Sequence, residues 1–210
     1  MFFINIIQEY FLILKFKILG FYKTTPEHYK VGKKGDILLI VGFNENWNFL
    51  NTIAESLNIK GYRIHFPTFK THATIEECTS LIIKYIEDFQ LNDLVIVTHS
   101  KGGLIARNLL LSSDDKIRNI IEIAAPNHGT IFGNLIFHNL RELKPKSRQL
   151  QILDNFKTSK IINIYPKFDN HVIPNSSLFL EGAKNVGIDI VGHTRILESK
   201  ELLTELDKIL

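Results

Sequence analysis

The sequence predicts an α/β fold: one doubly wound domain with a mostly parallel sheet of about six strands and helices on both faces. The prediction depends on two observations. Short apolar runs rich in isoleucine and valine alternate along the chain with longer segments of helical periodicity. These runs are continuously apolar, which is typical of parallel strands, because helices cover both faces of a parallel sheet and neither face meets water.

The composition is that of an ordinary globular protein. Of its 210 residues, 45% are hydrophobic and 22% charged, which argues against disorder. The 25 basic and 22 acidic residues leave a net charge of +3 without a long basic run, so we expect no nucleic-acid partner. The single cysteine, Cys78, excludes an internal disulfide and fits a reducing compartment. We therefore expect a cytoplasmic protein, with or without membrane association.

The first element in chain order is an apolar helical segment over residues 1–24. Four polar or charged residues interrupt its apolar run: Gln8, Glu9, Lys15 and Lys17. Charges in the middle of a spanning helix are costly in lipid, which disfavours a membrane span. Packing of the segment on the domain body is the favoured interpretation. A helix that lies in a membrane interface, with peripheral contact through residues 1–22, stays open as the alternative.

The domain itself is predicted over residues 25–210. Six apolar runs are expected to be its strands: Ile37–Val41, Tyr62–Phe66, Leu94–Val97, Ile117–Ala124, Ile161–Tyr165 and Val186–Val191. Four segments with helical periodicity are expected to be helices: Trp47–Leu57, Ile75–Phe89, Gly102–Leu111 and Arg195–Ile209. The alternation breaks at residues 130–156, an insertion between the fourth and fifth runs. Connections of that length are usually functional or mobile.

Ser100 lies where the third predicted strand turns into a helix. The apolar run ends at Thr98, and the helix opens near Lys101. A sharp strand-to-helix turn exposes a serine hydroxyl above the sheet, and the helix N-terminus adds partial positive charge that stabilises a developing oxyanion. A serine before a helix is more often an N-cap. Here the strand before it and the glycines after it, Gly102 and Gly103, favour a nucleophile elbow.

A serine hydroxyl needs a base and an acid that orients the base. His193 follows the last predicted strand, and Asp169 follows the strand before it. Both residues, like Ser100, therefore lie after the carboxyl ends of parallel strands, where open α/β sheets gather their sites. The chain order Ser, Asp, His is that of one class of hydrolases.

Five short segments follow one another in the order found in lipases: His99–Gly103, Ala124–Thr130, Lys146–Leu150, Asp169–Pro174 and Gly192–His193. On these segments the chain resembles α/β-hydrolases of the lipase/esterase type, triacylglycerol lipases among them, from about Asp36 to the C-terminus. The resemblance implies the α/β-hydrolase fold with a small cap at residues 130–156. It also implies Ser100 as nucleophile, His193 as base and Asp169 as orienting acid, with no cofactor.

The chain departs from the family pattern at two positions. Thr98 replaces the first glycine of the elbow, and Val41 replaces the histidine of the His-Gly pair after the first core strand. The oxyanion hole is expected to consist of the backbone N–H groups of Phe43 and Lys101. Because these donors belong to the backbone, replacing the histidine does not remove them.

The expected activity is hydrolysis of carboxylic esters, with an acyl ester or lipid as substrate and an acyl-enzyme as intermediate. Among enzymes, the alternative is an acyltransferase or thioesterase with the same triad. Among non-enzymes, the alternative is a binding module on the same fold. No metal or nucleotide motif is present. Apolar residues of the insertion would suit an aliphatic chain, although ordinary helix packing explains them equally well: Ile131, Phe132, Leu135, Ile136, Phe137 and Leu140.

Other polar residues compete for these roles. We expect His128 and His171 to be loop histidines rather than the base. Asp189 alternates within a strand and is expected to face solvent rather than act as the acid. Cys78, which has no Cys-x-x-Cys partner, is expected to be a small core residue.

Overall fold

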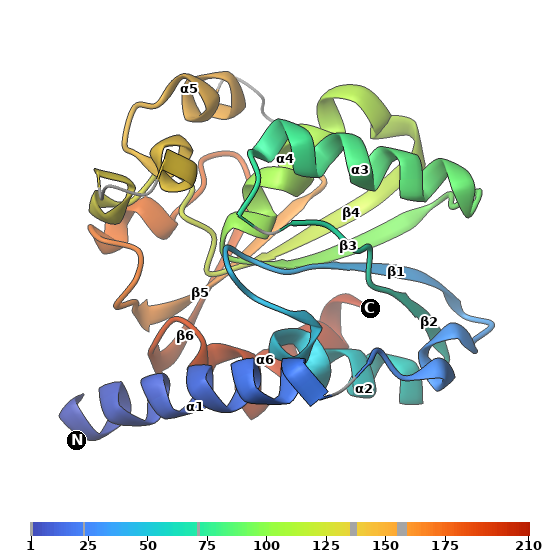
Figure 1. Ribbon diagram of the computed structural model, residues 1–210, viewed down its shortest axis with the longest axis horizontal. Coiled ribbons are helices and arrows are strands. Elements are labelled where there is room, and N and C mark those ends of the chain that lie inside the picture. Colours follow the sequence, from blue (N-terminus) through green and yellow to red (C-terminus); the bar gives the residue numbers. More distant parts are fainter. Residues whose placement is uncertain (1, 23, 71, 135–137, 155–158) are drawn as a thin grey trace.

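A six-stranded sheet forms the centre of the protein. The structure, a computed structural model, describes all residues except 1, 23, 71, 135–137 and 155–158. All six strands are parallel, in the order β2-β1-β3-β4-β5-β6 (Figure 1). They are β1 (Gly35–Ile40), β2 (Tyr62–His65), β3 (Leu94–His99), β4 (Ile117–Ile123), β5 (Ile161–Phe168) and β6 (Lys184–Val191). Each strand overlaps one of the predicted runs, and the predicted fold class is confirmed.

Helices cover both faces of this sheet, as Figure 1 shows. They are α1 (Phe2–Tyr22), α2 (Asn51–Ile59), α3 (Ile75–Asp88), α4 (Lys101–Ser113), α5 (Arg148–Asp154) and α6 (Lys200–Ile209). Helices α3, α4 and α5 pack on one face, and α1, α2 and α6 lie on the other. The predicted helix over 195–209 is split into a 3₁₀ turn, η7 (Arg195–Glu198), and α6, because the Ser199 hydroxyl accepts a hydrogen bond from the N–H of Leu202 and caps a new helix.

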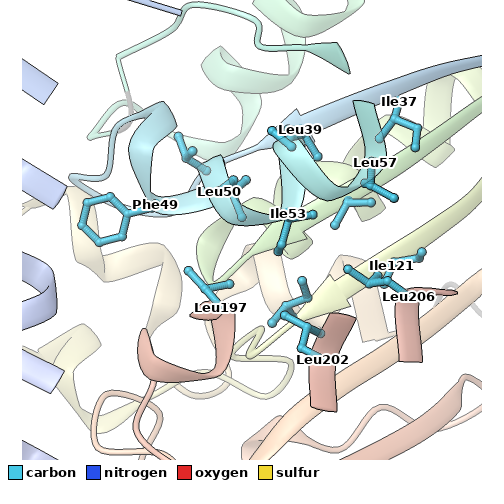
Figure 2. Packing of buried hydrophobic residues seen from close by; sticks show 14 of the residues in the cluster. Ile37, Leu39, Phe49, Leu50, Ile53, Leu57, Ile121, Leu197, Leu202 and Leu206 are labelled. Carbon is cyan, nitrogen blue, oxygen red and sulfur yellow. The ribbon is translucent and has the colours of Figure 1, made fainter. Parts of the chain in front are cut away.

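Strand β1 shows why both faces carry helices. Its side chains alternate, so Ile37 and Leu39 point to one face while Leu38 and Ile40 point to the other, and all four are buried. On the first face they meet the 3₁₀ turn η2 (Trp47–Leu50), α2, η7 and α6 (Figure 2). The side chains that they meet there are Leu50, Ile53, Leu57, Leu197, Leu202 and Leu206. The two cores hold the sheet rigid between them, so the loops at its edge start from fixed positions.

The carboxyl ends of the strands meet at one edge of the sheet, since all strands are parallel. Strand β1 leads into the loop that contains Gly42, and β3 leads into Ser100. Strand β5 leads into Asp169, and β6 leads into His193. This topology brings segments that are up to 150 residues apart in sequence to the same edge.

Helix α1 packs on the body through one of its faces. Phe16 is buried against Phe49, with 5.0 Å between the ring centroids, and Leu12 and Ile13 lie partly buried beside it. The side-chain amide of Asn46 donates to the carbonyl of Phe16 at 3.1 Å. Among the helices that the structure describes, none is long and apolar enough to cross a membrane.

The insertion at residues 130–156 contains two 3₁₀ turns, η4 (Ile131–Asn134) and η5 (His138–Leu143), followed by α5. Leu135, Ile136 and Phe137, for which the sequence left an acyl site and ordinary helix packing equally open, lie outside the described residues. The insertion is fixed to the body by Glu142, whose carboxylate accepts a hydrogen bond from the N–H of Ile75 at the start of α3.

Candidate active site

Ser100 occupies the turn between β3 and α4 in a conformation that few residues adopt. Its backbone has φ 54° and ψ −125°, and its N–H donates to the carbonyl of Ile123 at 2.9 Å. The side chain forms no capping hydrogen bond with α4, so the N-cap interpretation does not apply. The strained turn is the geometry of a nucleophile elbow, which leaves the hydroxyl free for another use.

Two glycines allow the backbone to approach this serine closely. A methyl group on Gly42 would lie 2.8 Å from the Cβ atom of Ser100, and one on Gly102 would collide with the carbonyl of Ile40. The loop after β1 therefore lies directly beside Ser100, and α4 packs closely against the end of β1. These contacts bring the backbone of the expected oxyanion donor Phe43 near the serine.

Asp169 and His193 form a buried pair. The Nδ1 atom of His193 lies 2.7 Å from Oδ2 of Asp169, and the exposed fractions of the two residues are 3% and 0%. The other carboxylate oxygen of Asp169 accepts two backbone hydrogen bonds, from His171 at 2.7 Å and Val172 at 2.8 Å. Since Nδ1 is held by the carboxylate, Nε2 is the nitrogen that His193 can offer to a substrate or to a serine.

The pair shifts the pKa values of both groups. Burial alone would lower the pKa of His193, but the Asp169 carboxylate and two more distant carboxylates outweigh burial and raise it. Burial alone would raise the pKa of Asp169, but the imidazole and the two backbone N–H groups hold it below its usual range. Both shifts favour an ionised carboxylate against a histidine that gains a proton readily, which suits a base and its orienting acid.

The loop after β5 is held in place by two asparagines that sequence reasoning did not identify. The side chain of Asn175 accepts from the N–H of Asp169 at 3.0 Å and donates to the Asp169 carbonyl at 2.8 Å. The side-chain oxygen of Asn170 accepts from the N–H of His193 at 3.1 Å. The two loops that carry the acid and the candidate base are thus tied together through backbone as well as side chains.

A cavity of about 400 Å³ opens at this edge of the sheet, and Ser100 and His193 both line it. The Ser100 hydroxyl forms no hydrogen bond with any residue that the structure describes. Contacts between nucleophile and base are often long in unliganded sites. The cavity wall is mainly apolar: Ile13, Phe43, Phe49, Pro126, Phe132, Leu140, Leu143 and Val172. Of the insertion's residues expected at an acyl site, Phe132 and Leu140 therefore contribute to the cavity.

No family model and no curated protein sequence match this chain. Solved structures do match its fold. An extracellular α/β-hydrolase from a Paenibacillus species is similar with a TM-score of 0.61 at 14% identity, over 83% of this chain and 97% of that one. The chain has the α/β-hydrolase fold. Est1E from Butyrivibrio proteoclasticus is similar with a TM-score of 0.65 at 16% identity, over 85% and 87% of the two chains. A monoacylglycerol lipase from Paleococcus ferrophilus is similar with a TM-score of 0.61 at 14% identity, over 85% of this chain and 93% of that one.

Within this α/β-hydrolase fold, a second buried pair lies beside the first and was not identified from the sequence. His99, the residue before the elbow serine, is fully buried, and its Nδ1 lies 2.7 Å from the Glu45 carboxylate. Its Nε2 lies 3.1 Å from the backbone carbonyl of His193. Both ring nitrogens of His99 thus lie within hydrogen-bond distance of an oxygen atom. Glu45 also accepts from the N–H of Gly42 at 2.6 Å, which joins three strand ends of the hydrolase fold in one network.

Glu9 of α1 contacts the loop that carries His193. It is fully buried, and its carboxylate accepts hydrogen bonds from the N–H groups of Thr194 at 2.7 Å and Arg195 at 2.9 Å. These N–H groups lie at the start of η7 and have no acceptor within that turn, so a negative charge there is stabilising. The sequence signal was present, because Glu9 is the only acidic residue in a mostly apolar helix.

The competing residues lie away from the reactive groups, with one exception. The Nδ1 atom of His128 lies 3.6 Å from Asp154, and the exposed Asp189 pairs with Lys167 at 3.0 Å. Cys78 is buried, and burial raises the pKa of its thiol. His171 does line the cavity, 4.9 Å from the His193 ring, but burial lowers its pKa to about 4.

Glu45, His99 and His193 are also the group that could hold a metal ion among the residues that the structure describes. One ligand atom from each lies within 4.8 Å of the others. The hydrogen bond between Glu45 and His99 already uses two of these side chains. The arrangement therefore supports a hydrogen-bonded network at least as well as a metal site.

Proposed function

We propose that the protein is a serine hydrolase that cleaves carboxylic esters through a Ser100–His193–Asp169 triad. The proposal depends on one observation: Ser100, in its strained turn, lines the same cavity as His193, and His193 is paired with the buried carboxylate of Asp169. The predicted chain order and the α/β-hydrolase fold support it. A non-catalytic module would have no need of this combination of strain and buried charge.

In the proposed reaction, Ser100 attacks the carbonyl carbon of the ester while Nε2 of His193 takes the hydroxyl proton. Asp169 holds the imidazole through Nδ1 and stabilises its protonated form. When the tetrahedral intermediate collapses, the bond to the alcohol oxygen breaks, and the proton passes from His193 to the leaving alcohol. Water then attacks the acyl-enzyme by the same route and releases the carboxylic acid and the free serine.

The negative oxygen of the intermediate is proposed to lie between the backbone N–H groups of Phe43 and Lys101. Lys101 is the first residue of α4, so its N–H has no acceptor within the helix and carries the helix's partial positive charge. The close approach of Gly42 to Ser100 supports Phe43 as the second donor. The Lys101 side chain is not part of this proposal, since its ammonium is buried and bonded to the carbonyl of Ala73.

The mainly apolar cavity supports an ester with an aliphatic acyl chain as the substrate class. Its volume of about 400 Å³ lies in the range of small-molecule sites. Aromatic and aliphatic side chains from α1, from the loop after β1 and from the insertion form the wall. Burial of a hydrocarbon chain there would contribute roughly 0.8 kcal/mol for each methylene group.

Labelling with a fluorophosphonate tests the proposal, because this probe reacts rapidly only with an activated serine. We expect the full chain to be labelled and to hydrolyse short-chain nitrophenyl esters. Ser100→Ala should lose the label and on the order of 10⁴-fold or more of the activity. Ser112→Ala, which changes an exposed serine at the far end of the same helix, is the matched control. Labelling of Ser100→Ala at the wild-type rate would refute the assignment.

A further inference from the structure

The outer face of α1 carries an exposed apolar stripe. It consists of Ile4, Ile7, Tyr10, Phe11, Leu14 and Ile18, with exposed fractions between 48% and 71%. The spacing of three and four residues places these side chains on one side of the helix. From Ile4 to Ile18 the stripe is continuous over roughly 20 Å of helix at 1.5 Å per residue. Continuous apolar surfaces of this kind mark interaction sites.

The opposite face of α1 packs on the body of the domain. The buried Glu9 carboxylate holds the loop after His193, and Phe16 is packed against Phe49. The helix therefore presents its stripe outward from a fixed position, along the lower edge of the molecule in Figure 1. The two alternatives from the sequence, packing on the body and exposure to a membrane, apply to different faces of the same helix.

The charges that α1 itself places beside the stripe have one sign, whereas Glu198 of η7 and Glu201 of α6 share a hollow with Ile7 and Lys15. At about 100° per residue, Lys15 falls on one edge of the stripe and Lys17 on the other. Neither lysine forms an ion pair with any residue that the structure describes. Glu9, the only acidic residue of the helix, is buried on the other face. An apolar strip between two lysines without ion-pair partners matches a bilayer surface with anionic headgroups, because the lysine stems can lie along the apolar strip while their ammonium groups reach the headgroups.

We propose that this stripe binds α1 to the surface of an anionic lipid bilayer, with the helix lying parallel to the surface. Tyr10 belongs to the stripe and also lines the cavity that contains Ser100, as does Lys17. Binding would therefore bring the rim of the cavity against the bilayer. A second copy of this chain fits less well. Pairing two stripes would bring lysines together without an acidic residue on either stripe.

Vesicle flotation with the full chain tests this proposal without depending on catalysis. We expect the protein to float with vesicles of phosphatidylcholine and phosphatidylglycerol in equal parts, and more weakly with phosphatidylcholine alone. Ile7→Gln combined with Phe11→Gln should lower binding about tenfold or more at an unchanged melting temperature. Ser100→Ala should float like the wild type, so failure of the proposed chemistry and failure of membrane binding are distinguishable.

The control changes two other exposed apolar residues, on the opposite side of the sheet. Leu81→Gln combined with Leu111→Gln alters α3 and α4 and should leave flotation unchanged. Absence of flotation of the folded wild type with anionic vesicles would overturn the proposal. So would equal flotation of the Ile7/Phe11 variant. A wild-type dimer in size-exclusion chromatography that this variant converts to a monomer, without flotation of either, would assign the stripe to a second copy instead.

Discussion

Replacing Glu9 tests whether α1 supports the loop that carries the candidate base. The carboxylate is fully buried and accepts two backbone hydrogen bonds, at 2.7 and 2.9 Å. Hydrogen bonds to charged groups contribute about 1.5–3 kcal/mol each. Glu9→Gln keeps one acceptor oxygen but turns an NH₂ group toward the other N–H, so it should lower the free energy of unfolding by about 1.5–3 kcal/mol. Glu9→Ala removes both acceptors and should cost about twice as much.

Urea unfolding followed by the fluorescence of the single tryptophan, Trp47, measures this effect. Gln8→Ala is the matched control, because Gln8 is the exposed neighbour on the same helix and its replacement should change stability by no more than about 0.5 kcal/mol. The reasoning is refuted if Glu9→Gln unfolds at the same urea concentration as Gln8→Ala. In that case the two hydrogen bonds do not contribute to the fold.

Three further substitutions test the buried charges. Asp169→Asn should lower the rate of ester hydrolysis on the order of 10⁴-fold. It should also move the acid limb of the pH–rate profile to lower pH, since the carboxylate raises the pKa of His193 and a base works only when unprotonated. Glu45→Gln should lower kcat roughly tenfold or more with little change in KM, because the network through Glu45 holds the backbone of His193. Arg107→Leu should cost about 3–5 kcal/mol of stability by leaving the buried carboxylate of Glu122 alone, whereas Arg107→Leu with Glu122→Leu should recover most of the loss.

Each of these predictions has an outcome that contradicts it. For the acid, Asp189→Asn is the control, and a larger loss of rate in that variant than in Asp169→Asn would mean that the acid is misassigned. For Glu45, a change in KM alone would point to substrate contact rather than positioning. For the core pair, a double variant less stable than Arg107→Leu would show that the two charges are not coupled.

The residues predicted from the sequence are those whose signal is local. The sequence indicates Ser100 as a candidate because a strand, a turn and a glycine-rich helix start are adjacent there, and His193 and Asp169 because each follows a strand. Alternating apolar and helical segments likewise predicted all six strands.

Glu45 and Glu9 were not identified from the sequence, because their hydrogen-bond partners are distant in the chain. Glu45 contacts His99 over 54 positions, and Glu9 contacts Thr194 over 185 positions. No periodicity links such pairs, since tertiary contacts alone bring them together. The 3₁₀ turns of the insertion were not predicted either, because apolar side chains there suggested a regular helix while its short connections are held by individual hydrogen bonds.

The contact between Glu9 and the N–H groups of Thr194 and Arg195 can form only late in synthesis, because its two sides lie near opposite ends of the sequence. At translation rates of about 5–20 residues per second, roughly 10 to 40 s separate the appearance of residue 9 from that of its partners. During this interval Phe16 can already contact Phe49, but Glu9 has no hydrogen-bond partner. The carboxylate of Glu9 is therefore the last contact of α1 with the domain to form, and until then a membrane surface or a chaperone can compete with the domain for the apolar faces of this helix.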